Sequence, residues 1–112
     1  MRNYSMLVLV FSCIAAPLAA AAESKIEISS PADGAKLDAM EQSKMDYNVT
    51  LGSGADHIHV YVDGKEAALL RQLKGSYTME TLSPGNHEIC IKLVNKNHTP
   101  IGVERCIKVE VD

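Results

Sequence analysis

The sequence has little positive charge, and that charge gathers nowhere along the chain. Its 112 residues contain 11 Lys and Arg against 14 Asp and Glu, which gives a net charge of −3. The four tyrosines and the single phenylalanine are not interleaved with basic residues. Nucleic-acid-binding proteins need a basic surface to neutralise phosphates, so we expect no nucleic-acid partner.

The sequence also lacks an uninterrupted apolar run of the roughly 20 residues that a transmembrane helix needs. Its N-terminal apolar segment, Met6 to Ala16, is broken by polar residues and followed by Pro17. With Arg2 before it and a run of alanines after it, the segment has the layout of a secretory signal peptide. We therefore predict a signal peptide over residues 1–22 and a mature domain over residues 23–112, periplasmic or secreted and without a transmembrane segment.

Cysteine is scarce, with three residues in the whole chain. Val10 to Cys13 faintly resembles a lipoprotein cleavage box, so a lipid anchor at Cys13 is an alternative, although Phe11 fits that box poorly. Removal of the signal leaves Cys90 and Cys106, and an even pair in an exported chain predicts a disulfide. The absence of a Cys-x-x-Cys sequence argues against a redox pair.

The stretch from Asn86 to Val111 predicts an antiparallel hairpin whose register is specified by its own side chains. In such a hairpin, the residue numbers of every facing pair add up to the same total. If Cys90 faces Cys106, that total fixes all the other pairs. The same total places opposite charges on one face: Glu88 with Lys108 and Lys92 with Glu104. On the other face it sets the apolar pairs Ile89 with Ile107 and Leu93 with Val103, and also Ile91 against Arg105. We expect a core face and a solvent face, with a disulfide that contributes about 3 kcal/mol to stability.

Alternation of apolar and polar residues predicts further strands before this hairpin. They cover Lys25–Ser29, Met45–Leu51, His57–Val62 and Tyr77–Thr81. Ala35–Ser43 and Ala67–Leu73 are compatible with a short strand or a helical turn, and Gly75 is expected to close the second of these. About seven short strands with Gly and Pro turns between them predict an all-β fold, an immunoglobulin-like antiparallel sandwich of two sheets.

Three short motifs resemble those of the bacterial immunoglobulin-like domains of exported proteins: Ser30–Ala35 (SPADGA), Val60–Lys65 (VYVDGK) and Leu82–His87 (LSPGNH). The sequences His57-x-His59, Pro84-Gly85-x-His87 and His98-x-Pro100 also resemble a family of small secreted bacterial proteins of unknown function. These resemblances imply a binding or spacing module, whose partner would be an unidentified protein or glycan of the envelope. The chain departs from antibody domains in having no tryptophan.

His57 and His59 occupy alternate positions of one predicted strand, so they share a face and lie about 7 Å apart. If this strand runs antiparallel beside the first strand of the hairpin, its start lies near the loop 95–101, which carries His98. Three imidazoles at one place predict a Cu(II) or Zn(II) site, with Asp56 as an oxygen ligand or hydrogen-bond partner. In the alternative interpretation, the histidines form the ordinary polar face of a half-exposed strand.

The fourth histidine, His87, is expected at the other end of its strand, pointing inward opposite Val109, and is excluded from this site. No nucleophile-elbow sequence is present, and no spacing singles out a pair of carboxylates, so we expect no enzyme. The sequence thus predicts an exported binding or accessory module of the bacterial envelope. The alternative is a periplasmic copper- or zinc-binding protein that uses His57, His59 and His98.

Overall fold

The structure, a computed structural model, describes residues 23–112. The predicted signal peptide over residues 1–22 and the alternative lipid anchor at Cys13 lie outside the described residues. The described chain forms eight strands: β1 (Lys25–Ser30), β2 (Ala35–Leu37), β3 (Lys44–Thr50), β4 (His57–Val62), β5 (Lys65–Leu70), β6 (Lys74–Thr78), β7 (Gly85–Val94) and β8 (Pro100–Val111).

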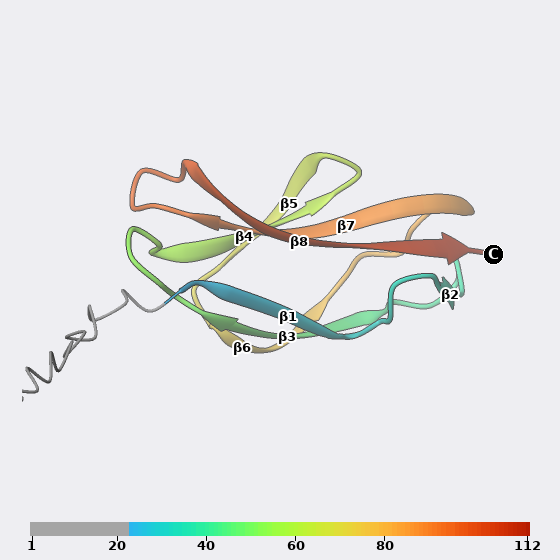
Figure 1. Cartoon of the computed structure of the whole chain (residues 1–112). Helices are drawn as coiled ribbons and strands as arrows, with labels where there is room; N and C mark the ends of the chain where they lie inside the picture. Colours follow the sequence, from blue (N-terminus) through green and yellow to red (C-terminus); the bar gives the residue numbers. More distant parts are fainter. Residues whose placement is uncertain (1–22) are drawn as a thin grey trace, which may run out of the picture.

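The strands pack as two layers (Figure 1), a three-stranded sheet ordered β1-β3-β6 and a five-stranded sheet ordered β2-β8-β7-β4-β5. The predicted all-β immunoglobulin-like sandwich is therefore confirmed, with one strand more than expected. Among residues 23–112, no helix has the length and hydropathy needed to cross a bilayer.

The core lies between the two sheets and is built mainly from alternate residues of β1, β3, β4, β7 and β8. Inward-facing side chains of both layers are buried: Ile26, Met45, Tyr47, Val49, Ile58, Val60, Ile89, Ile91, Leu93, Ile107, Val109 and Val111. Alternation along a strand sends successive side chains to opposite faces, so the period of two visible in the sequence becomes one apolar face on each sheet. The two faces bury each other.

The β7–β8 hairpin has the predicted register over most of its length. Cys90 lies opposite Cys106 with their Cα atoms 4.0 Å apart, and the two form a disulfide. The predicted pairing of Leu93 with Val103 is wrong, because the register shifts between Lys92 and Val94, and Val94 then pairs with Pro100. Gly102 has φ +89, a left-handed conformation that glycine adopts at bulges without steric cost.

The structure differs from the expected sandwich at β2, and it shows which conformation the segment Ala67–Leu73 adopts. The sandwich is not wholly antiparallel, because β2 pairs in parallel with β8 at the edge of the larger sheet. The turn before β2 is held against β8 by the Gly34 amide, which donates to the Lys108 carbonyl at 2.7 Å. The undecided segment Ala67–Leu73 contributes to strand β5, and Gly75 lies inside β6 opposite Tyr47 instead of closing the preceding segment.

Strand β4 is an interior strand of the larger sheet, with β5 on one side and β7 on the other. In the pairing with β7, His57 lies opposite Val94, the last residue before the hairpin loop. The start of β4 and the loop between β7 and β8 therefore lie at the same end of the molecule, as Figure 1 shows. This arrangement, which was predicted from the sequence, brings His57 and His59 to the same end of the molecule as His98.

Candidate metal centre

Three histidines meet at the start of β4. Nε2 of His57 lies 3.0 Å from Nε2 of His59 and 3.0 Å from Nδ1 of His98, and the third side of this triangle is 3.3 Å. His57 and His59 come from one strand face, and His98 comes from the loop between β7 and β8. The structure thus brings together the three residues that the sequence indicated.

The two strand histidines are buried, with 1% of His57 and 3% of His59 exposed, whereas His98 is exposed. The alternative interpretation, an ordinary half-exposed polar face, is therefore wrong for His57 and His59. Burying a polar ring is unfavourable unless each nitrogen has a partner. The buried ring nitrogens of the cluster therefore require partners.

The size of the triangle suits a metal ion. A point about 1 Å out of the plane of the three nitrogens lies about 2.1 Å from each of them, which matches a Zn–N bond. The nitrogens need no rearrangement to reach this distance.

His57 is oriented by the residue that precedes it. Its Nδ1 lies 2.9 Å from Oδ2 of Asp56, and because a carboxylate only accepts, Nδ1 donates. This hydrogen bond is the main reason why the pKa of Asp56 is lowered, and the charges of His57, Arg71 and Lys96 act in the same direction against a smaller effect of burial. Asp56 is therefore the predicted hydrogen-bond partner of His57, and with Nδ1 directed at Asp56 the ring directs Nε2 at the other two histidines.

His59 faces a second carboxylate, which the sequence did not indicate. Its Nδ1 lies 3.3 Å from Oε1 of Glu66 on β5, yet the geometry is not that of a hydrogen bond, and the buried Nδ1 has no partner among the described residues. Glu66 therefore faces the ring without holding it. Burial is the largest cause that lowers the pKa of His59, so the ring is neutral near pH 7, as a metal ligand must be.

No sequence signal identified Glu66, because its position depends on the pairing of β5 with β4. A register shift between Val60 and Tyr61 sets Tyr61 opposite Glu66. A bulge of this kind redirects a side chain and leaves no trace in the alternation of residues.

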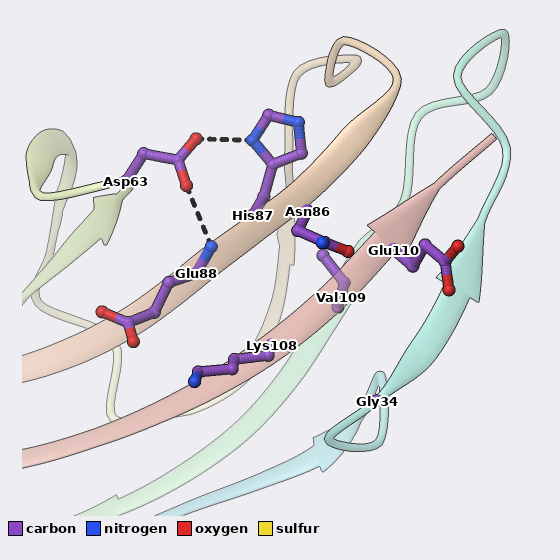
Figure 2. A pocket seen from close by; sticks show the side chains of 8 residues that line it. All are labelled: Gly34, Asp63, Asn86, His87, Glu88, Lys108, Val109 and Glu110. Carbon is purple, nitrogen blue, oxygen red and sulfur yellow. Dashed lines mark hydrogen bonds and ion pairs between the residues drawn. The ribbon is translucent and has the colours of Figure 1, made fainter.

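His87 lies away from these three residues, as predicted. Figure 2 shows Asp63, in the turn between β4 and β5, bridging the His87 ring and the backbone of Glu88. The ring nitrogens of His87 face oxygen atoms: Nδ1 lies 2.5 Å from Oδ2 of Asp63, and Nε2 lies 2.6 Å from the carbonyl oxygen of Ser83. Both nitrogens therefore donate, and the ring is an imidazolium.

The charge of His87 follows from these contacts. The hydrogen bond to Asp63 is the largest cause that raises the pKa of His87, and the same bond lowers the pKa of Asp63. Ser83 Oγ is 3.5 Å from Nε2, but the proton on Nε2 points to the carbonyl oxygen of the same residue. The ring cannot accept a proton from that hydroxyl, so Asp63, His87 and Ser83 do not form a hydrolytic triad.

A second grouping of ligand-type residues, Glu88 with Cys90 and Cys106, is not a metal site. Both sulfur atoms are joined in the disulfide, and only a thiolate ligates metals strongly.

No protein-family model and no curated protein matches the chain. Among solved structures, it is similar to the fibronectin(III)-like modules of CbhA from Clostridium thermocellum, with a TM-score of 0.62, 19% identity, and coverage of 79% of this chain and 96% of that one. It is also similar to a Jonesia denitrificans lytic polysaccharide monooxygenase, with a TM-score of 0.51, 16% identity, and coverage of 70% of this chain and 58% of that one.

A third similar structure is the extracellular domain of a proposed hybrid two component system from B. thetaiotaomicron, with a TM-score of 0.51 and 16% identity. The match covers 72% of this chain but only 12% of that one. At these identities the comparisons establish a shared fold. The chain is thus a β-sandwich domain of fibronectin(III)-like and immunoglobulin-like architecture.

Proposed function

We propose that this chain is an exported β-sandwich protein that binds one copper or zinc ion through His57, His59 and His98. A single observation carries the proposal: three imidazole nitrogens lie within 3.3 Å of one another, without an oxygen atom of the described residues between them to accept or donate. Imidazole is a favoured ligand of both metals.

The proton count supports a cation over a hydrogen-bonded cluster. A neutral imidazole has one N–H, and His57 gives its own to Asp56. His59 and His98 then supply at most one N–H each, which is two N–H groups for three contacts. A cation bound to all three nitrogens would satisfy every contact at once.

The partners of the histidines also fit a metal site. Metal-bound histidines usually give their second N–H to a carboxylate or carbonyl, which fixes the ring and raises its basicity. Asp56 has this position beside His57, and Glu66 is within reach of His59. Glu66 is half exposed, so its carboxylate is free to rotate onto Nδ1 of His59.

Three protein ligands leave one tetrahedral position for an exchangeable ligand. His98 is exposed, so this position is accessible from solvent. The core and the disulfide already stabilise the domain, and we propose that the metal is held for exchange and not for folding. Binding or delivery of copper or zinc outside the cytoplasm is the function that this site supports best.

The test is a calorimetric titration of untagged, metal-free protein with Zn(II) and Cu(II). The full chain is expressed, and the exported protein is purified from the periplasm. We expect one ion per chain, and no tight binding in a His98→Ala variant. His98 is exposed, so its removal leaves the core intact, which unfolding curves will check. Binding of neither ion, or equal binding by the variant, would overturn the proposal.

A second candidate function is that of an accessory module that recognises a protein or glycan of the envelope. The likeness to the fibronectin(III)-like modules of CbhA and to an extracellular domain favours it, as does the solvent exposure of Leu69, 41%, on edge strand β5. Retention of the protein on envelope polysaccharides, and its loss in Leu69→Ser, would support this candidate. Equal retention of both forms would count against that surface.

A further inference from the structure

His98 differs from the other two histidines in what holds it. His57 and His59 lie on an interior strand that is paired on both sides. His98 lies in the short connection between β7 and β8, outside the ladder of either strand. Its position depends on contacts within that connection.

One side chain organises this connection. Oδ1 of Asn95 accepts hydrogen bonds from the backbone amides of Asn97, at 2.9 Å, and Thr99, at 3.0 Å. These two residues flank His98 in the sequence. The backbone of Asn95 closes the same loop, since its carbonyl accepts from the His98 amide at 3.0 Å and its amide donates to the Thr99 carbonyl at 3.0 Å.

The loop holds His98 in a backbone conformation that it would not choose alone. His98 has φ +62, in the left-handed region, where a side chain with a Cβ is disfavoured. Such a conformation persists only where the surrounding contacts impose it. Loss of the Asn95 acceptor frees both neighbours of His98 and lets its backbone return to negative φ, which redirects the ring.

We infer that Asn95 is the positioning residue of the metal site: it fixes His98 so that Nδ1 lies within 3.3 Å of the nitrogens of His57 and His59. This inference rests on the proposed metal-binding function. Asn95 touches no ion itself and acts only through the loop. It determines whether the third ligand is in place before the ion arrives.

The expected effect is a loss of metal affinity without loss of fold. Asn95→Ala should weaken Zn(II) binding by about 10–100-fold, the range for residues that orient a ligand, mainly through faster release of Zn(II) to a chelator. Asn95→Asp keeps an oxygen that accepts from both amides and should restore most of the affinity. Asn97→Ala is the matched control, because it removes the same side chain from the same loop and leaves the Asn95 acceptor in place.

A double-mutant cycle separates positioning from a general structural role. In a His98→Ala background, Asn95→Ala should have no further effect on the affinity for Zn(II). An equal loss in both backgrounds, or a wild-type affinity in Asn95→Ala alone, would overturn the inference while leaving the metal site standing. If the unsubstituted protein binds neither Zn(II) nor Cu(II), the proposed function fails, and this inference fails with it.

Discussion

The two ends of the larger sheet each hold a cluster of polar side chains that contains histidine. His57, His59 and His98 meet at one end, and His87 meets Asp63 and Ser83 at the other. In the cluster of His57, His59 and His98, nitrogen faces nitrogen. At His87, both nitrogens face oxygen. The first arrangement has at most two N–H groups for three contacts, and the second has an acceptor for every proton.

This difference in partners decides the chemistry of each cluster. Oxygen acceptors stabilise the charged imidazolium, so His87 takes up a proton and forms an ion pair with Asp63. Burial, and to a smaller extent the neighbouring imidazoles, disfavour that charge at His59, so the ring stays neutral and is available to a metal. The same residue type is a cation at one end of the sheet and, under the proposed function, a metal ligand at the other.

The largest effect should come from removing the two strand ligands. We expect His57→Ala/His59→Ala to lower the affinity for Zn(II) and Cu(II) by more than the about 100-fold typical of residues that only orient a ligand. His87→Ala is the matched control and should bind as the unsubstituted protein does. Calorimetry measures both, and a loss of binding in His87→Ala would erase the distinction between the clusters.

The disulfide lies in the β7–β8 hairpin, between the two clusters. Removing it tests whether the geometry of the metal site depends on the stability of that hairpin. Replacing Cys90 and Cys106 by Ala should cost about 3 kcal/mol of unfolding free energy, because the unfolded chain is no longer constrained. Metal affinity should change little, since pairing of β4 with β7 and the Asn95 loop hold the ligands. Urea unfolding and a Zn(II) titration of the same variant will check this, and a parallel loss of affinity would show that the ends are coupled.

Each cluster contains an aspartate beside a histidine, so the same substitution can be made in both and the effects compared. Asp56→Asn removes the charge beside His57 and should weaken metal binding by about 10–100-fold. Asp63→Asn makes the same change beside His87 and should leave metal affinity unaltered. Competition with a chromophoric chelator is sensitive enough for both, and equal losses would contradict the assignment of Asp56.

The smallest effect should be the pH dependence of stability at His87. The pKa of His87 is raised above 6.5, so its pair with Asp63 stabilises the fold fully below about pH 6.5 and loses this contribution as pH rises through the folded-state pKa. The pKa of Asp63 is lowered, so the contribution is present above about pH 3.8 and is lost as pH falls through its own folded-state value. Because Asp63 is 46% exposed, solvent screening limits the effect to about 1 kcal/mol or less.

Urea unfolding of the protein and of Asp63→Asn, from about pH 5 to about pH 9, measures this contribution as a difference in slope. The unsubstituted protein should lose more stability toward alkaline pH than the variant does. Identical pH profiles would mean that His87 is not held as an imidazolium.

The parts of this protein that depend on local periodicity can be predicted from the sequence alone. Alternation in Ile26 to Ile28, Met45 to Leu51 and His57 to Val62 marks strands, and constant-sum pairing around Cys90 and Cys106 sets the main register and the disulfide. The position of His98 near His57 also followed, because the order of two antiparallel neighbours fixes which ends meet.

The partners of the histidines, in contrast, depend on how the strands are arranged in the folded domain. Burial of His57 and His59, the approach of Glu66 across a bulge, and the pairing of His87 with Asp63 depend on strand order and on turns. The bulge near Val94 and the parallel pairing of β2 were likewise invisible in the alternation. Periodicity reports which face a side chain occupies, whereas the partner that it meets there is set by residues distant in the chain.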